Sequence, residues 1–257
     1  MTYEPKFPFG TLGKKIMKLT WRARILALSV CSVSYLVAPL ALAAQEPPES
    51  APHTLWSHLK EGKGSAEIRY RFEAFERDGA PYTAPAYAPT LKLVLGYETP
   101  SFHGFSAFAQ GLAVIVTGPA DYSIPTLPSQ NRPDRPAILD PKYLELGQGY
   151  LRWTRGPQNK KLALTVGRQE IMLNDGRFVS IAPQRQNHQT FDAAKLNAEL
   201  PWHFSFTYAF LNRANRIVGP DATDGKPPMH SHLLNLAWRK PSQVNVSLYG
   251  VLLDSTP

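Results

Sequence analysis

Apolar and polar residues alternate one by one in a series of short segments that begins near Ser65 and continues to the end of the chain. The clearest segment, 202–210, reads Trp-His-Phe-Ser-Phe-Thr-Tyr-Ala-Phe. Successive side chains of a β-strand point to opposite faces, so this segment predicts a strand with one aromatic face, formed by every second residue from Trp202 to Phe210, and one polar face.

The same pattern predicts nine strands, and the connections between them are long and short in turn. The expected strands are 66–75, 91–98, 105–117, 145–155, 161–169, 187–199, 202–210, 231–239 and 243–253. The expected long loops are 76–90, 118–142, 170–186 and 212–230. Transmembrane β-barrels combine alternating strands with short turns at one end and long loops at the other. The predicted fold is therefore all-β, an antiparallel transmembrane barrel, with the third strand ambiguous in its facing.

The first predicted strand shows why a soluble core is disfavoured. Its apolar face holds Ile68, Tyr70 and Phe72, whereas the opposite face presents Glu67, Arg69, Arg71 and Glu73 in succession. Four charges on one face are costly in a dry core, but they are stable in a water-filled lumen.

An export signal precedes this region. Basic residues between Lys14 and Arg24 are followed by an apolar stretch from about Ile25 and by the small residues of 41–44, the pattern of a cleaved signal peptide. A retained transmembrane anchor is the alternative. We expect a signal peptide at 1–44, a proline-rich periplasmic lead-in at 45–63 and the barrel portion at 64–257.

Removal of the leader lowers the net charge of the remaining chain and removes its single cysteine. The formal charge of +8 includes six basic residues and one acid before Gln45, so the remainder holds 22 basic and 19 acidic residues, a net +3. This small excess gives no reason to expect a nucleic-acid partner. Cys31 lies within the leader, which leaves the mature chain without disulfides.

Several motifs then resemble one known family. The stretch 164–178 (LTVGRQEIMLNDGRF) and its continuation 185–192 (RQNHQTFD) are similar to the alginate-export outer-membrane proteins, as are 150–153, 206–213 and 230–232. The resemblance covers about 65–254 and implies a monomeric barrel of about eighteen strands in the bacterial outer membrane, with arginines along a path for anionic polysaccharide. Nine strands is half of that number, and we expect this chain to be the N-terminal half of such a barrel.

The candidate solute path consists of cations on the polar face and in one long loop. Arginine suits carboxylates because its planar guanidinium donates two parallel hydrogen bonds, and rings of charge set the ion preference of a pore. The alternative is that these cations only pair with Glu67, Glu73 and Glu98. The wall candidates are Arg69, Arg71, Lys92, Arg152 and Arg239, and the loop candidates, in a possible inward constriction, are Arg177 and Arg185.

Other chemistry has weaker support. His230 and His232 have a spacing that can hold a metal, but no further ligand is adjacent, and Ser231 between them cannot be activated by neighbours that face the other side. We expect no enzyme activity, no cofactor and no metal. The expected function is an outer-membrane channel for anionic solutes, including alginate-like polyuronates. The alternatives are a non-conducting truncated barrel, an adhesin or structural wall protein, and a soluble lectin-like sandwich.

Overall fold

The computed structural model describes residues 59–157, 160–240 and 245–254. The expected signal peptide, most of the lead-in and the first two residues of the expected strand 243–253 lie outside these residues. Within the described part, no helix has the length and apolar character needed to cross a membrane.

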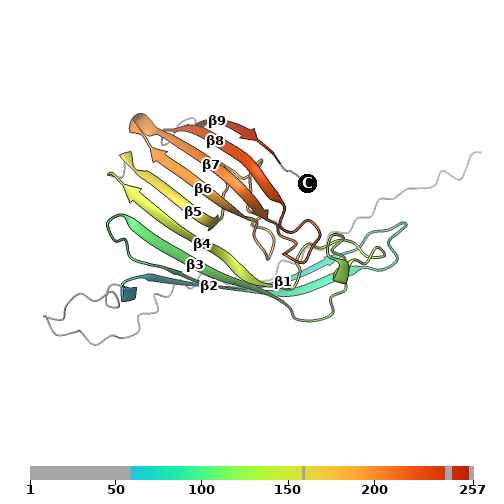
Figure 1. Ribbon diagram of the computed structural model, residues 1–257. Helices are drawn as coiled ribbons and strands as arrows, with labels where there is room; N and C mark the ends of the chain where they lie inside the picture. The colour runs from blue at the N-terminus through green and yellow to red at the C-terminus, as the bar shows by residue number, and fades with distance from the viewer. Residues whose placement is uncertain (1–58, 158–159, 241–244, 255–257) are drawn as a thin grey trace, which may run out of the picture.

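The described residues form one antiparallel sheet in which each strand pairs with the next along the chain, as Figure 1 shows. Fold class and strand order are as predicted. The strands are β1 (Lys63–Phe75), β2 (Ala86–Glu98), β3 (Phe105–Val116), β4 (Tyr143–Arg155), β5 (Leu162–Gln169), β6 (Thr190–Glu199), β7 (Phe204–Asn215), β8 (Pro228–Arg239) and β9 (Asn245–Leu252).

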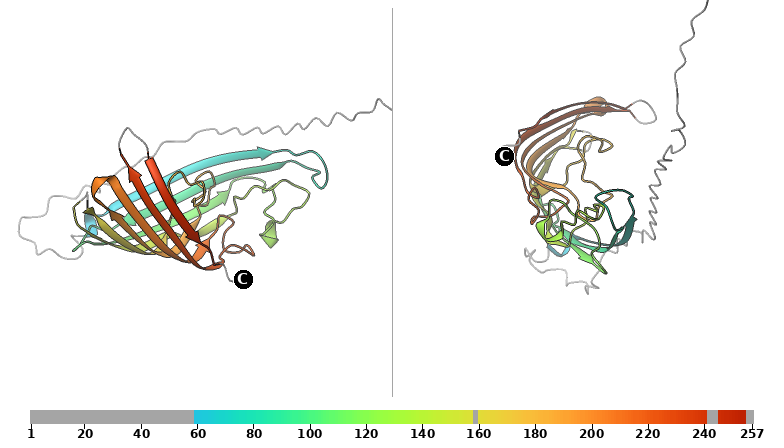
Figure 2. Two further views of the ribbon diagram at one scale, coloured as in Figure 1. Left: turned by 90° about the horizontal axis from the view of Figure 1, so that it is seen from above. Right: turned by 90° about the vertical axis from the view of Figure 1, so that its right-hand side faces the viewer.

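The sheet is curved, and its two faces differ as the alternation predicts. Apolar side chains of the convex face are widely exposed, for example Leu95 (70%), Leu151 (65%) and Leu248 (73%). Seen end-on, the sheet bends around several loops that lie on its concave side (Figure 2). A free apolar face of this extent is what a lipid-facing barrel wall requires.

The strand register resolves the facing of β3, which the sequence left open. Val114 of β3 is paired with Lys92, and Phe108 is paired with Glu98, so both lie on the concave face. Ala109 is paired with the outward Tyr97 and therefore faces outward. Phe108 also stacks on the inward Tyr150, with ring centroids 5.2 Å apart.

Short connections join the strands at one end of the sheet and long loops join them at the other, as expected. The long loops lie at 76–85, 117–142, 170–189 and 216–227. The last three do not project away from the sheet. They pack on the concave face and bury Tyr122, Ile138, Ile171 and Val218 against the strands or one another. These loops therefore cover part of the concave face next to the long-loop end.

Packing of these loops explains where the predicted strand bounds were wrong. β2 begins at Ala86, five residues before the expected start, because Ala86 and Ala88 are buried against Tyr122 of the loop 117–142. Pro89 is tolerated because it lies one residue beyond the β2–β3 register, which starts at Thr90. Likewise β8 begins at Pro228, where Met229 packs against the cluster around Ile171.

The predicted starts of the sixth and seventh strands were too early. Asn187 does not enter β6, because its side-chain amide donates to the carbonyl oxygen of Ile217 at 3.1 Å. Trp202 was placed on the aromatic face of its strand, and this was wrong: it lies in a 3-10 turn, η3 (Pro201–His203), with φ of 59°. Its carbonyl accepts a hydrogen bond from Trp238. The remaining strand bounds differ from the predictions by up to five residues.

Candidate solute path

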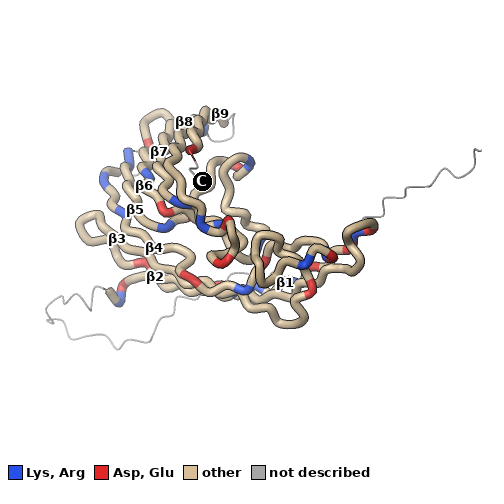
Figure 3. The backbone as a smooth tube through the Cα atoms, turned by 45° about the vertical axis from the view of Figure 1, so that its right-hand side comes forward, with Lys and Arg blue, Asp and Glu red and all other residues tan. Residues whose placement is uncertain are grey.

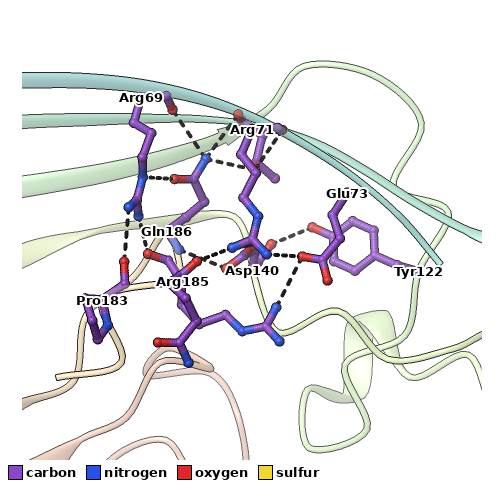
Figure 4. A network of polar contacts seen from close by, with 10 residues as sticks. Arg69, Arg71, Glu73, Tyr122, Asp140, Pro183, Arg185 and Gln186 are labelled. Atoms are coloured by element: carbon purple, nitrogen blue, oxygen red, sulfur yellow. Dashed lines mark hydrogen bonds and ion pairs between the residues drawn. The ribbon is translucent and has the colours of Figure 1, made fainter. Parts of the chain in front are cut away.

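The concave face of β1 and β2 carries three of the predicted cations, and all three contact the loop 170–189. Arg69 donates from Nε to Oε1 of Gln186 at 2.9 Å and from Nη1 to the carbonyl of Pro183 at 3.1 Å, and it also reaches the carbonyl of Arg185. Arg71 donates to the carbonyl of Gln184. Figure 4 shows these guanidinium groups, which hold the backbone of the loop against the wall of the sheet.

Two carboxylates complete this cluster. Glu73 accepts from Arg71 and, at 3.4 Å, from Nη1 of Arg185 (Figure 4). Asp140, from the loop 117–142, is fully buried, accepts from the backbone N–H of Gln186 at 2.9 Å and lies 3.4 Å from Nη1 of Arg71. A buried carboxylate is tolerated only when it is paired and hydrogen-bonded, and Asp140 meets both conditions.

The side chain of Gln186 joins the loop to both strands. It is fully buried, and its amide nitrogen donates to the carbonyl and hydroxyl oxygens of Thr90 at 3.1 and 2.9 Å and to the carbonyl of Arg69 at 3.3 Å. Tyr122 donates from its hydroxyl to the carbonyl of Asp140 at 2.6 Å. Burial of this phenol raises the pKa of Tyr122, so the hydroxyl stays protonated where it donates.

A second group of contacts centres on Lys92, which is 1% exposed. Its ammonium lies 3.1 Å from Glu67 and 3.3 Å from Nε2 of His188, and Nδ1 of His188 lies 2.8 Å from Glu170. With charged Lys92 donating to Nε2, the imidazole of His188 donates from Nδ1 to the carboxylate of Glu170. Both ends of the loop 170–189 are thus fixed near β2.

Arg152, on β4, lies apart from this loop. Its Nη1 is 3.5 Å from Glu98, its Nη2 donates to the hydroxyl of Tyr150 at 2.9 Å, and its guanidinium carbon is 4.9 Å from the centre of that ring. This is the pairing with Glu98 that was considered from sequence.

The turn at Asn174 carries the loop 170–189 to the opposite end of the sheet. Oδ1 of Asn174 accepts from Arg239, the last residue of β8, at 3.4 Å and from Ser247 of β9 at 3.0 Å. Phe178 stacks on Tyr249 of β9 at 5.3 Å between ring centroids. The loop therefore folds inward and extends across the concave face, the geometry that a constriction requires.

A cavity of about 820 Å³ lies between this turn and the wall. Arg239 belongs to its lining, and among the described residues its guanidinium donates to the neutral oxygens of Asn174 and Ser205. Arg177, the other cation of the cavity, is exposed and lies 3.2 Å from Asp175. The cavity is lined by Asn174, Asp175, Arg177, Phe178, Arg239, Asn245, Ser247 and Tyr249.

The seven predicted cations thus fall into three places. One group lies where the loop 170–189 contacts β1 and β2 and consists of Arg69, Arg71, Lys92 and Arg185. The cavity is lined by Arg177 and Arg239. The third place is on β4, where Arg152 pairs with Glu98. Figure 3 shows Lys and Arg close to Asp and Glu along β1 and the neighbouring loops.

Sequence reasoning missed the residues that connect one loop to another. Asp140 and Gln186 are separated by 46 positions, and no local motif marks either. Arg168 of β5 was also missed; it pairs with Asp192 at 2.9 Å and Glu145 at 3.3 Å, and Glu145 in turn contacts Lys226 of the loop 216–227. Lys195, paired with Thr165 of β5, was missed because apolar Phe191 and Ala193 share its face and hide the alternation of β6.

His230 and His232, which were considered as metal ligands, lie near the long-loop end of β8. His232 is paired with outward Phe210, and its Nδ1 lies 2.9 Å from the hydroxyl of Tyr208. Ser231 faces the other way and donates to the carbonyl of Asp254. The described residues contain no group of three or more His, Cys, Asp or Glu side chains arranged to hold a metal ion.

Comparison with known proteins agrees with this geometry. Residues 66–216, more than half of the chain, match the family model described as alginate export. Searches of curated proteins and of solved structures found no match. The all-β sheet with an exposed apolar convex face fits the outer-membrane β-barrels of this transport family. The chain belongs to the alginate-export family of outer-membrane β-barrel proteins.

Proposed function

We propose that the protein is a passive outer-membrane channel for anionic solutes, including alginate-like polyuronates, whose lumen is lined by arginine and lysine and narrowed by the loop 170–189. Family membership supports the channel class. The finer proposal, a preference for anions, rests on the balance of charge on the concave face.

The observation that carries the proposal is an excess of positive charge in the interior. The carboxylates of Glu67, Glu73 and Glu98 each have a cation within 3.5 Å. Among the inward cations, Arg69, Lys195 and Arg239 have no carboxylate within ion-pair distance among the described residues, whereas one inward acid, Glu170, is paired with His188 and not with a lysine or arginine. Uncompensated charge in a lumen attracts ions of the opposite sign, because low-dielectric walls focus the field.

The mechanism requires no covalent step. A solute enters at one end, is selected by the interior field and by the width that the loop 170–189 leaves, and diffuses to the other end. The proposed membrane contact is the convex apolar face, and the proposed route to the outer membrane is export by the cleaved leader at 1–44, followed by the lead-in 45–63 and the barrel portion 64–257.

Planar-bilayer recordings test this proposal. Purified full-length protein should give stepwise conductance, and in a potassium chloride gradient the reversal potential should show that chloride is the more permeant ion. The triple variant Arg69→Gln, Lys195→Gln, Arg239→Gln should lose most of this preference, whereas Arg77→Gln, in an outer loop, should keep it. A folded barrel that gives flat traces favours the non-conducting or adhesin alternative, and cation preference removes the charge argument.

A further inference from the structure

The contact between His188 and Lys92 depends on the charge of the imidazole. Nε2 of His188 lies 3.3 Å from the ammonium of Lys92, and Nδ1 lies 2.8 Å from the carboxylate of Glu170. An ammonium has donors and no acceptor, so Nε2 can accept from Lys92 only while the imidazole is neutral. A protonated imidazole would direct an N–H and a second positive charge at the ammonium.

Burial holds Lys92 in place against such a charge. Its side chain is 1% exposed, and its ammonium lies 3.1 Å from Glu67. Arg69 is paired with Lys92 in the register of β1 and β2 and adds a further positive charge there. His188, by contrast, belongs to a loop and is partly exposed. Repulsion should therefore move the loop residue and leave the buried lysine where it is.

Glu170 stabilises a protonated imidazole without holding it on β2. Glu170 directly follows β5, and its backbone N–H donates to the side chain of Gln148 on β4 at 3.1 Å. His188 lies two residues before β6, the neighbour of β5 in the sheet. The pair belongs to the base of the loop, so it can persist after the contact with Lys92 is lost.

The charges around this contact are balanced only while His188 is neutral. In the described part of the chain they are those of Glu67, Arg69, Lys92 and Glu170, two acids and two cations. Protonation of His188 adds one uncompensated positive charge.

The other elements packed on this segment supply no charge to offset it. Asn187, next to His188, donates to the backbone carbonyls of Arg216 and Ile217, and the guanidinium of Arg216 is itself paired with Asp224. On β4, Tyr150 interacts with Glu170, but a phenol is neutral at and below about pH 7.

We propose that protonation of His188 is an acid-sensitive switch that detaches the inner end of the loop 170–189 from β2 and thereby widens the pore. An imidazole changes charge between about pH 5 and 8, whereas carboxylic acids do so near about pH 4 and ammonium groups near about pH 10. The attachment of Gln186 to Thr90 remains, so the switch shifts an equilibrium between attached and detached loops. Widening of the pore rests on the proposed function, whereas detachment is a property of the loop alone.

A spin label on the loop measures detachment without requiring conduction. Gln184→Cys places one cysteine on an exposed part of the loop, in a mature chain expected to have no other. Electron paramagnetic resonance of an attached nitroxide separates mobile from immobile label in the purified full-length protein. The ratio of mobile to immobile label should rise about tenfold from about pH 7.5 to about pH 5.5, because a charge-assisted hydrogen bond is exchanged for a repulsion. Higher-conductance transitions in bilayers should become more frequent over the same range.

Two variants remove the switch at its two partners. His188→Gln keeps an acceptor for Lys92 but takes up no proton in this range, and Lys92→Met removes the ammonium that a protonated imidazole would meet. In both, the ratio should change less than about twofold between the two pH values. His230→Gln, at an exposed histidine of β8, is the matched control and should respond as the unchanged protein does. If Lys92→Met gives no folded band on gels, His188→Gln decides alone.

An acid response in His188→Gln as large as in the unchanged protein, or no response in the unchanged protein, overturns the switch. Bilayer recordings of the same preparations distinguish this failure from a failure of transport. Anion-selective conductance with label mobility that does not depend on pH leaves the channel standing and removes the switch. Flat traces with acid-induced mobility that His188→Gln abolishes retain the switch and remove transport.

Discussion

Replacement of Gln186 by alanine should release the loop 170–189 from the wall and enlarge the pore. The side chain makes four hydrogen bonds to Arg69 and Thr90 that alanine cannot make, and it is fully buried, so water does not replace them readily. Because the amide nitrogen has only two hydrogens, about three of these bonds form at once, and at a net value of about 1 kcal/mol for each bond their loss amounts to about 3 kcal/mol. Because about 1.4 kcal/mol corresponds to a factor of ten, the detached population should rise about a hundredfold.

Single-channel recording is the assay for this change. Gln186→Ala should show frequent transitions to a higher conductance that are rare in the unchanged protein. Gln189→Ala is the matched control, because Gln189 belongs to the same loop but its side chain makes one marginal contact, 3.5 Å to the carbonyl of Ser180. If Gln186→Ala folds, as judged by heat-modifiable migration on gels, and records like Gln189→Ala, the loop does not narrow the pore through this contact.

Three further outcomes follow from the same structure. Arg71→Met leaves the buried Asp140 without its cation and should destabilise the fold by about 3 kcal/mol, seen as a lower thermal midpoint, whereas Arg77→Met should leave the midpoint unchanged. Burial raises the pKa of Tyr122 above that of the unfolded chain, so its contribution to stability is present below pH about 10 and is lost as the pH rises through the folded-state pKa. Tyr122→Phe should lower stability near neutral pH by about 1 kcal/mol and flatten the alkaline part of the stability profile in a pH-dependent unfolding series; an unchanged alkaline slope contradicts this assignment. Gly167 has φ of 128°, and a Cβ there would lie 2.4 Å from the carbonyl oxygen of Gly149, so Gly167→Val should abolish the folded band on gels while Gly64→Val, in open space, should retain it.

The fold was predictable because its signal is local. A lipid-facing wall requires apolar residues at every second position, so Ile68, Tyr70 and Phe72 reveal both the strand and its facing without knowledge of any partner. The seventh strand shows the limit of this signal. Trp202 continues the aromatic alternation, yet Pro201 and the positive φ of Trp202 place it in a turn, where its backbone bonds to Trp238.

The arrangement of the site was only partly predictable. Inward facing of Arg69 and Arg71 followed from alternation, but their contacts did not, because Arg69 meets Gln186 across 117 positions of sequence. The Asn-Asp-Gly sequence at 174–176 favours a turn by its composition alone, whereas the contacts of Asn174 with Arg239 and Ser247 arise only when the loop folds into the concave face. Long-range packing of this kind leaves no periodic trace in a single sequence.

Formation of a disulfide between the turn at Asn174 and the wall at β9 tests most directly whether the loop 170–189 crosses the interior of the channel. Asn174→Cys with Ser247→Cys places cysteines at two positions whose native side-chain oxygens lie 3.0 Å apart, in a mature chain expected to have no other cysteine. We expect that mild oxidation in outer membranes cross-links this pair, that Asn174→Cys with Ser106→Cys does not cross-link, and that the cross-linked protein still conducts anions. Absence of the cross-link, or a cross-linked protein that no longer conducts, would contradict a channel with the loop 170–189 folded across its interior.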